Sequence, residues 1–188
     1  MRLKHFSFIL LLFLTACGYQ LRGSIELPEG MENLYLENAS GRLQQEIRSA
    51  LKFSKGQLVS TPEEAGIVIK VLREEMKTRV LSVSSTGKAN QFELIYNLNF
   101  SIFSPTGELL LANQKVNSQR HYFNDQEEVL AQTNEEQLIR NEMYSQAVRS
   151  IVIRSRIAME HQQKAQKEKK NMTKLDALKQ QELKQKPE

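Results

Sequence analysis

The chain has 188 residues, with 26 basic and 22 acidic side chains and a formal net charge of +4. The positive excess lies at the two ends: residues 161–188 carry eight lysines against four acidic residues, whereas residues 17–160 are slightly acidic. The charge is therefore no evidence for a nucleic-acid-binding protein. A single cysteine excludes disulfides within the chain and the common cysteine-based metal sites.

Residues 1–16 have the three parts of a secretory signal peptide. Arg2 and Lys4 supply positive charge, residues 6–14 form an apolar run broken once by a serine, and two small residues follow. The apolar run is too short to remain as a membrane-spanning helix, which needs about 20 residues. We therefore expect residues 1–16 to be removed during export.

The only cysteine follows this segment directly. Leu14, Thr15, Ala16 and Cys17 resemble the lipobox, the recognition sequence of bacterial lipoprotein processing. The resemblance implies that the thiol of Cys17 is acylated, that the chain is cut before it, and that the new amino terminus is acylated too. Two acyl chains already give stable anchoring to a membrane. Gly18, where many inner-membrane lipoproteins have aspartate, indicates the periplasmic side of the outer membrane.

The first elements predicted after the anchor are a strand and a helix. Residues 33–37 alternate around Leu34 and Leu36 and predict a short strand. Ser40 is the expected N-cap of an amphipathic helix over residues 41–54, because apolar residues then recur at helical spacing along one face.

Further strands are predicted from shorter patterns. Residues 58–59 begin one extended segment, and residues 67–72 form a strand rich in β-branched side chains. Residues 78–83 either continue this strand or pair with the one that follows. Residues 82–90 are small and polar, which predicts a loop.

The clearest pattern is a long β-hairpin over residues 92–122. The apolar residues Phe92, Leu94, Tyr96, Leu98, Phe100 and Ile102 alternate with mostly polar ones. Because successive side chains of a strand point to opposite faces, this predicts a half-buried strand. Residues 104–107 read Ser-Pro-Thr-Gly, which is typical of a turn, and residues 109–122 are the expected partner strand.

A second helix is predicted over residues 134–158. Thr133 and Glu136 have the spacing of a capping box at its start. One broad apolar stripe follows, formed by Ile139, Met143, Ala147, Val148, Ile151 and Val152. The stripe fades after about residue 160. The segment 161–188, rich in lysine and glutamine, has little to bury and is expected to be disordered or a frayed helix.

Together these elements predict an α+β fold, with a small mixed, mostly antiparallel sheet and two helices packed on one face. Residues 17–160 are expected to form this single domain. The sequence has no metal-ligand spacing and no catalytic motif, and His121 and His161 are far apart. We therefore expect neither an enzyme nor a bound cofactor.

Several short motifs resemble the LptE family, the lipopolysaccharide-assembly lipoproteins of Gram-negative outer membranes. They are Cys17-Gly18-Tyr19-Gln20-Leu21-Arg22-Gly23, the hairpin residues 92–107, Tyr122-Phe123-Asn124-Asp125, Asn134-Glu135-Glu136-Gln137 and Asn141-Glu142-Met143-Tyr144. Their order and spacing over residues 14–155 carry the resemblance. The fold predicted above, with two helices on a small sheet, also agrees with the fold of this family.

Membership would imply a defined set of partners. An LptE protein is the small partner of LptD, the outer-membrane β-barrel that delivers lipopolysaccharide to the cell surface. It would sit largely inside the barrel as a one-to-one plug, help the barrel to fold and bind lipopolysaccharide. Because the lumen of a large barrel is polar, such a plug should resemble a soluble domain.

The resemblance also assigns a site to the polar loop, which occupies the position of a family loop that contacts barrel and ligand. The expected interface residues are Ser84, Ser85, Thr86, Gly87 and Asn90. Lipopolysaccharide carries phosphates, with which a lysine can pair as a point charge. Lys88 is the first candidate contact and Arg79 the second. Gln132 stands where some family members have a basic residue, so a two-site basic patch is not expected.

Two competing interpretations stay open at this point. Lys88 could be an ordinary exposed lysine. The whole protein could be a free periplasmic lipoprotein that binds a small ligand or a cell-wall glycan. A barrel plug should copurify with a large β-barrel at one-to-one stoichiometry, whereas a free ligand-binding protein should be recovered alone.

Overall fold

The structure, a computed structural model, describes residues 27, 30–52, 54, 56–123 and 129–184. In chain order the elements are β1 (Asn33–Glu37), α2 (Gly41–Lys52), β2 (Gln57–Leu58), a 3-10 helix η1 (Pro62–Glu64), β3 (Ile67–Val83), β4 (Ala89–Phe103), β5 (Leu109–Phe123) and α3 (Val129–Lys184). The predicted signal peptide and Cys17 lie outside the described residues.

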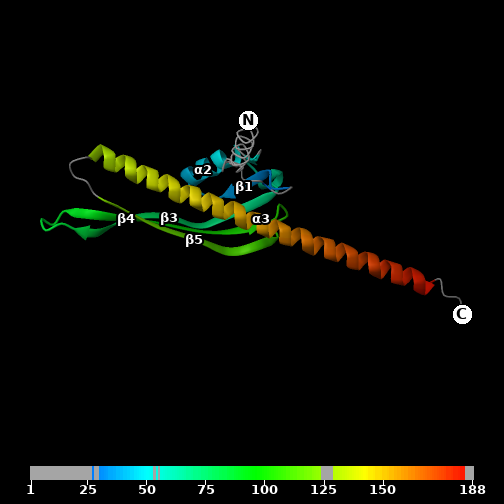
Figure 1. The fold of residues 1–188 in the computed structure, drawn as a ribbon. Helices are drawn as coiled ribbons and strands as arrows, with labels where there is room; N and C mark the ends of the chain where they lie inside the picture. Colours follow the sequence, from blue (N-terminus) through cyan, green and yellow to red (C-terminus); the bar gives the residue numbers. More distant parts are fainter. Residues whose placement is uncertain (1–26, 28–29, 53, 55, 124–128, 185–188) are drawn as a thin grey trace, which may run out of the picture.

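The strands form one sheet in the order β2-β1-β3-β4-β5. Strand β1 runs parallel to both of its neighbours, whereas β3, β4 and β5 form an antiparallel meander. Both helices cover the same face of this sheet, and no described element covers the opposite face, which we call the open face (Figure 1). The predicted α+β fold, with a mixed, mostly antiparallel sheet and two helices on one face, is confirmed.

Strand β4 lies at the centre of the meander and follows the predicted alternation. The side chains that face the helices are fully buried: Leu94, Tyr96, Leu98, Phe100 and Ile102. Burial of each such side chain contributes about 1.5–3 kcal/mol to folding. Strand β5 pairs with β4 in antiparallel register, with Val116 opposite Leu98 and Asn117 opposite Asn97. The predicted hairpin over residues 92–122 is therefore confirmed.

Strand β3 is longer than predicted. It runs unbroken from residue 67 to residue 83 and pairs with β4 over most of this length. Residues 78–83 thus both continue the first half of the strand and pair with the next one. The charged stretch 73–77 interrupts the apolar pattern in the sequence. Its extended conformation depends on cross-strand pairing with β4 rather than on its own composition.

Helix α2 begins as predicted. The hydroxyl of Ser40 accepts a hydrogen bond from the backbone N–H of Leu43 at 3.2 Å, which is the N-cap arrangement. Leu43, Ile47 and Leu51 recur on one side of the helix and are buried. This apolar face joins the side chains of β4 in one hydrophobic core.

Helix α3 begins earlier than predicted. It starts at Val129, so Thr133 lies inside the helix and the predicted capping box is wrong. The carboxylate of Glu136 instead accepts hydrogen bonds from Tyr122 and Arg140, both at 2.8 Å. The bond from Tyr122 ties the first turns of α3 to the end of β5, whereas the bond from Arg140 lies within α3. The apolar stripe packs as expected, with Met143, Ala147, Val148, Ile151 and Val152 buried.

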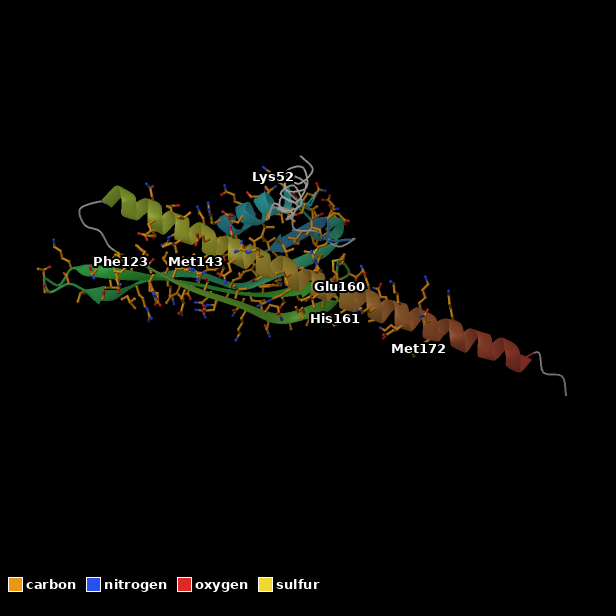
Figure 2. The ribbon with its side chains drawn as sticks, in the orientation of Figure 1. Lys52, Phe123, Met143, Glu160, His161 and Met172 are labelled. Atoms are coloured by element: carbon orange, nitrogen blue, oxygen red, sulfur yellow. The ribbon has the colours of Figure 1, made fainter. Side chains whose placement is uncertain are left out.

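Helix α3 continues far beyond the sheet, to residue 184 (Figure 1). Figure 2 places Glu160 and His161 where the helix leaves the sheet and Met172 on the projecting part. Met172 is 65% exposed, and all side chains from 163 to 174 are exposed. This stretch therefore adds nothing to the core, and fraying of the segment 161–188 stays a prediction. Within the described residues, no helix has both the length and the apolar composition to cross a membrane.

Candidate functional site

The turn between β3 and β4 forms the tip of a hairpin at one end of the molecule (Figure 1). The N–H of Ser84 donates to the carbonyl of Lys88 at 2.7 Å, and the N–H of Gly87 donates to the carbonyl of Ser84 at 2.9 Å. Gly87 has φ = +77°, in the left-handed region that favours glycine. The hydroxyls of Ser84 and Thr86 are 2.9 Å apart. The tip is therefore a well-defined turn.

The turn between β4 and β5 has the same construction. The N–H of Ser104 donates to the carbonyl of Glu108 at 2.8 Å, and the N–H of Gly107, with φ = +83°, donates to the carbonyl of Ser104 at 3.0 Å. Both turns follow the pattern Ser-x-Thr-Gly. They lie at opposite ends of β4, so one end of the sheet presents Lys88 and the other presents Glu108.

The polar loop is shorter than predicted. Strand β3 extends to Val83 and β4 begins at Ala89, which leaves only residues 84–88 between them. Asn90, which was expected in the loop, is an exposed residue of β4. Lys88 is exposed at the tip, and its ammonium group forms no hydrogen bond or ion pair with any residue that the structure describes. This group is therefore available to an anion.

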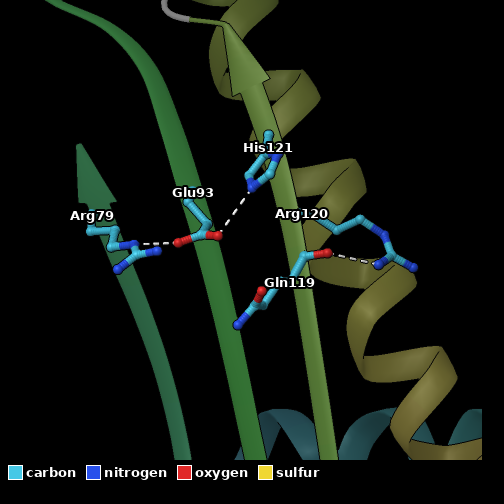
Figure 3. Close-up of polar contacts among 5 residues, drawn as sticks. All are labelled: Arg79, Glu93, Gln119, Arg120 and His121. Carbon is cyan, nitrogen blue, oxygen red and sulfur yellow. Dashed lines mark hydrogen bonds and ion pairs between the residues drawn. The ribbon is translucent and has the colours of Figure 1, made fainter. Parts of the chain in front are cut away.

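Arg79 lies on the open face of the sheet and already has a partner. Its Nε contacts one carboxylate oxygen of Glu93 on β4, and the other oxygen is 3.0 Å from Nε2 of His121 on β5 (Figure 3). The side chain of Glu93 is only 4% exposed, although those of Arg79 and His121 are 62% and 56% exposed. The two basic side chains therefore cover the carboxylate and link three strands.

This cluster supports the order of the two candidate anion contacts, with Lys88 ahead of Arg79. The hydrogen bond from His121 and the neighbouring Arg79 hold the pKa of Glu93 below its usual value. A lowered carboxyl pKa stabilises the folded state above the ordinary pKa, and this contribution disappears as the pH falls through the lowered value. Glu93 is therefore ionised at neutral pH, where an anionic ligand would compete with it for Arg79. Lys88 has no such competitor among the described residues.

A group of exposed apolar side chains below the tip was not apparent from the sequence. Val80 is 52% exposed, Val83 is 62% exposed and Phe123 is 63% exposed. The register brings Phe123 to this end of the sheet, because it pairs with Gln91. Val80 pairs with Phe92 on the helix side of the sheet, whereas Phe123 lies on the open face, so these side chains do not form one patch. The tip thus presents a free ammonium group, with exposed apolar side chains on both faces of the sheet below it.

Other acidic side chains have partners within the fold. Glu74 accepts hydrogen bonds from the hydroxyl of Ser40 at 2.6 Å and from the hydroxyl of Tyr96 at 3.1 Å. Glu75 forms ion pairs with the two basic residues on either side of it along β3. Among the described residues, no group of three or more His, Cys, Asp or Glu side chains could hold a metal ion. These carboxylates therefore stabilise the sheet and the first helix.

Two curated relatives match most of the chain. The LPS-assembly lipoprotein LptE of Photorhabdus laumondii is 26% identical over 140 residues, which cover 73% of this chain and 76% of that protein. The LPS-assembly lipoprotein LptE of Pectobacterium atrosepticum is 25% identical over 158 residues, which cover 81% of this chain and 85% of that protein.

Two solved structures have the same fold. An uncharacterized lipoprotein B from Nitrosomonas europaea has a TM-score of 0.58 at 24% identity, over 72% of this chain and 88% of that one. The rare lipoprotein B from Shewanella oneidensis has a TM-score of 0.54 at 24% identity, over 70% of this chain and 98% of that one. The sequence model of the LptE family, described as lipopolysaccharide-assembly, matches residues 31–155. The chain therefore belongs to the LptE family.

Proposed function

We propose that this protein is the lipid-anchored plug of an LptD-type β-barrel and that it binds lipopolysaccharide during delivery to the cell surface. The observation that carries the proposal is the family match over residues 31–155, together with relatives named for lipopolysaccharide assembly. Acylated Cys17 would hold the domain at the periplasmic face of the outer membrane. One copy would serve one barrel and help it to fold, and the tip with Lys88 would contact lipopolysaccharide.

The open face of the sheet supports a position inside a barrel. Along its centre, Asn97 lies opposite Asn117, and Asn99 lies opposite Lys115. Amide and charged side chains of this kind lose free energy when they are moved from water into hydrocarbon. They suit the polar lumen of a large barrel instead.

The competing function, a free periplasmic lipoprotein that binds a small ligand or a glycan, gives a different result in one experiment. Full-length protein is extracted from membranes with mild detergent and affinity-purified. A plug should be recovered with a large β-barrel at one-to-one stoichiometry. Recovery of the protein alone would refute the plug function and favour the free lipoprotein.

The substitution Lys88→Glu should weaken lipopolysaccharide binding without changing the fold. Lys88 is exposed, so the melting temperature of the domain should stay nearly unchanged. Reversal of one charge opposite a phosphate should raise Kd about three- to tenfold at low salt. The effect should be smaller at high salt, where screening is stronger. Titration of purified protein with lipopolysaccharide at two ionic strengths measures both effects.

Lys115→Glu is the matched control for this substitution. Lys115 is an exposed lysine on β5, and its replacement changes the net charge by the same amount. Its Kd should remain near that of the wild type if binding depends on the tip. Identical curves for Lys88→Glu and the wild type would remove Lys88 from the site, and Arg79 would then be the remaining candidate.

Deletion of residues 165–188 should leave folding and barrel docking intact. Every described side chain from 165 to 174 is exposed, so the melting temperature should fall by less than about 3 °C. Thermal melting and copurification with the barrel measure the two properties. A deletion that starts at residue 150 is the control, because it also removes buried Ile151 and Val152 and should prevent folding. Loss of the barrel from the shorter deletion would contradict the prediction.

A further inference from the structure

One edge of the sheet is only partly paired. Strand β1 pairs with β3 as far as Glu37 opposite Lys70, and the chain then turns away at Asn38, which has φ = +60°. Beyond Lys70, no strand among the described residues lies beside β3 on this side. The outward N–H and C=O groups of the strand therefore lack a strand partner there. Residues 73–80 form the regular part of this free edge, because register shifts mark both of its ends.

A cleft of about 580 Å³ lies where the free edge begins. It is bounded by the β1–α2 turn, by the start of the free edge and by Tyr144 of α3. Glu74 accepts hydrogen bonds from the N–H of Ser40 at 2.9 Å and from its hydroxyl at 2.6 Å, which hold the turn against β3. Leu72, displaced at the first register shift, lines the cleft and is 49% exposed. The cleft is therefore built into the fold.

We propose that the free edge and its cleft are the docking site for one extended segment of the barrel partner, which adds to the sheet as a further strand beside residues 73–80. The inference rests on the barrel partnership proposed above. Strand addition uses main-chain hydrogen bonds for affinity and neighbouring pockets for selectivity. The regular edge is longer than a typical strand of about 5–6 residues. An apolar side chain of the segment enters the cleft against Leu72 and Tyr144.

Charges along the edge define the chemistry of this segment. Side chains alternate between faces, so Arg73, Glu75, Lys77 and Arg79 share the open face. Glu75 is shared between Arg73 at 3.0 Å and Lys77 at 2.8 Å, and Arg79 is paired with Glu93 of β4. Three basic and two acidic side chains thus leave one net positive charge on this part of the open face. Opposite charges on facing strands stabilise a sheet. The docking segment therefore carries carboxylates at alternate positions on its open-face side.

A second copy of this chain fits the edge less well than a segment that carries only carboxylates. Two copies would pair antiparallel about a twofold axis, so the charged row would meet itself. An axis at Met76 places Arg73 opposite Arg79, although it also places Glu75 opposite Lys77. An axis at Lys77 places this lysine opposite its own copy, although it also places Glu75 opposite Arg79. A twofold axis at Glu75 places Lys77 opposite Arg73, and a twofold axis at Thr78 places Lys77 opposite Arg79. Like charges directly opposite each other destabilise a strand pair.

The outer edge of β5 is less suited to strand addition. Helix α3 is tied to β5 there, because Oε1 of Gln146 accepts hydrogen bonds from Ser118 at 3.1 Å and Arg120 at 3.3 Å. Asn113 has φ = +47°, which interrupts the extended backbone of β5. Strand β5 therefore serves as an internal comparison for β3.

Hydrogen–deuterium exchange of the full-length protein, alone and copurified with its barrel, tests the proposal. Strand addition should slow exchange of the outward amides within residues 73–80 about tenfold or more, because each gains a main-chain hydrogen bond. Residues 114–120 of β5 should change much less. Unchanged exchange at 73–80, or protection of β5 that equals or exceeds it, would overturn the proposal. Recovery of the protein without any barrel would instead refute the proposed function.

Two matched lysine variants give a second test. Lys77→Glu places a carboxylate beside the incoming strand, whereas Lys167→Glu makes the same change on the projecting part of α3, where the side chain is exposed. Lys77→Glu should reduce the recovered barrel about threefold, and Lys167→Glu should leave it unchanged. Melting temperatures of the two variants confirm that both are folded. Equal recovery of the barrel by the two variants would overturn the proposal.

Discussion

Leu98→Asp should unfold the domain or leave it too unstable to purify. Leu98 is fully buried at the centre of β4, and Glu74 lies opposite it on β3. A carboxylate at this position would lose its hydration, and the second carboxylate nearby would repel it. The cost is about 3–5 kcal/mol or more, against a typical domain stability of about 5–15 kcal/mol. Thermal melting followed by circular dichroism measures the loss.

Asn97→Asp is the control, one residue away on the opposite face of β4. The side-chain oxygen of Asn97 accepts a hydrogen bond from Asn117, and an aspartate keeps this acceptor. The new charge faces Glu75 across the strand pair, which should cost about 0.2–1 kcal/mol. Equal losses of melting temperature in the two variants would mean that the two faces of β4 have been assigned the wrong way round.

Cys17→Ser should abolish lipid attachment. The thiol of Cys17 is the predicted acceptor of the first acyl group, and cleavage before this residue depends on that step. Metabolic labelling with a radioactive fatty acid should therefore give a labelled wild type and an unlabelled variant. The variant should also retain residues 1–16 and migrate as a larger precursor. Without acyl chains, each of which adds about 0.8 kcal/mol per buried methylene, the anchor itself is absent.

Lys88→Glu is a useful control for the labelling experiment, because its substitution lies far from the processing site in the sequence. It should be labelled and cleaved like the wild type. Fatty acid retained on Cys17→Ser would contradict the assignment of this chain as a lipoprotein.

The hairpin was predictable because β4 has one buried and one open face. Leu98 is apolar and faces the helices, whereas the neighbouring Asn97 is polar and faces the open side. The middle of β3 lacked this signal, since the charged residues there lie on both faces. Glu74 points to the helix side and is satisfied by Ser40 and Tyr96. The partners come from β1–α2 and β4, so only the assembled sheet explains why a carboxylate is tolerated at that position.

The start of α3 was mispredicted because a local signal competed with tertiary contacts. Thr133 and Glu136 have capping-box spacing, but Glu136 bonds to Tyr122 of β5 and to Arg140 one turn later. The apolar stripe from Met143 onward was predictable, because burial against a sheet imposes a helical period on the sequence.

The candidate site was predictable only in part. Residues 84–88 are small and polar with one glycine, and this composition predicts a turn whatever the fold. The partner of Arg79 was not predictable, since Glu93 and His121 lie 14 and 42 residues further along the chain. The free edge of β3 was not predictable from the sequence either. It exists because β1 ends at Glu37, and the pairing of strands cannot be read from local periodicity.

The two turns at the ends of β4 have the same pattern of backbone hydrogen bonds. A lysine follows the glycine in one turn, and a glutamate follows it in the other. Gly87 and Gly107 supply the backbone conformation, whereas Lys88 and Glu108 supply backbone bonds that any residue except proline could make. The side chain at this position can therefore differ without loss of the turn. Substitution at the position after the glycine can therefore change the charge at the end of the hairpin while the backbone of the turn stays the same.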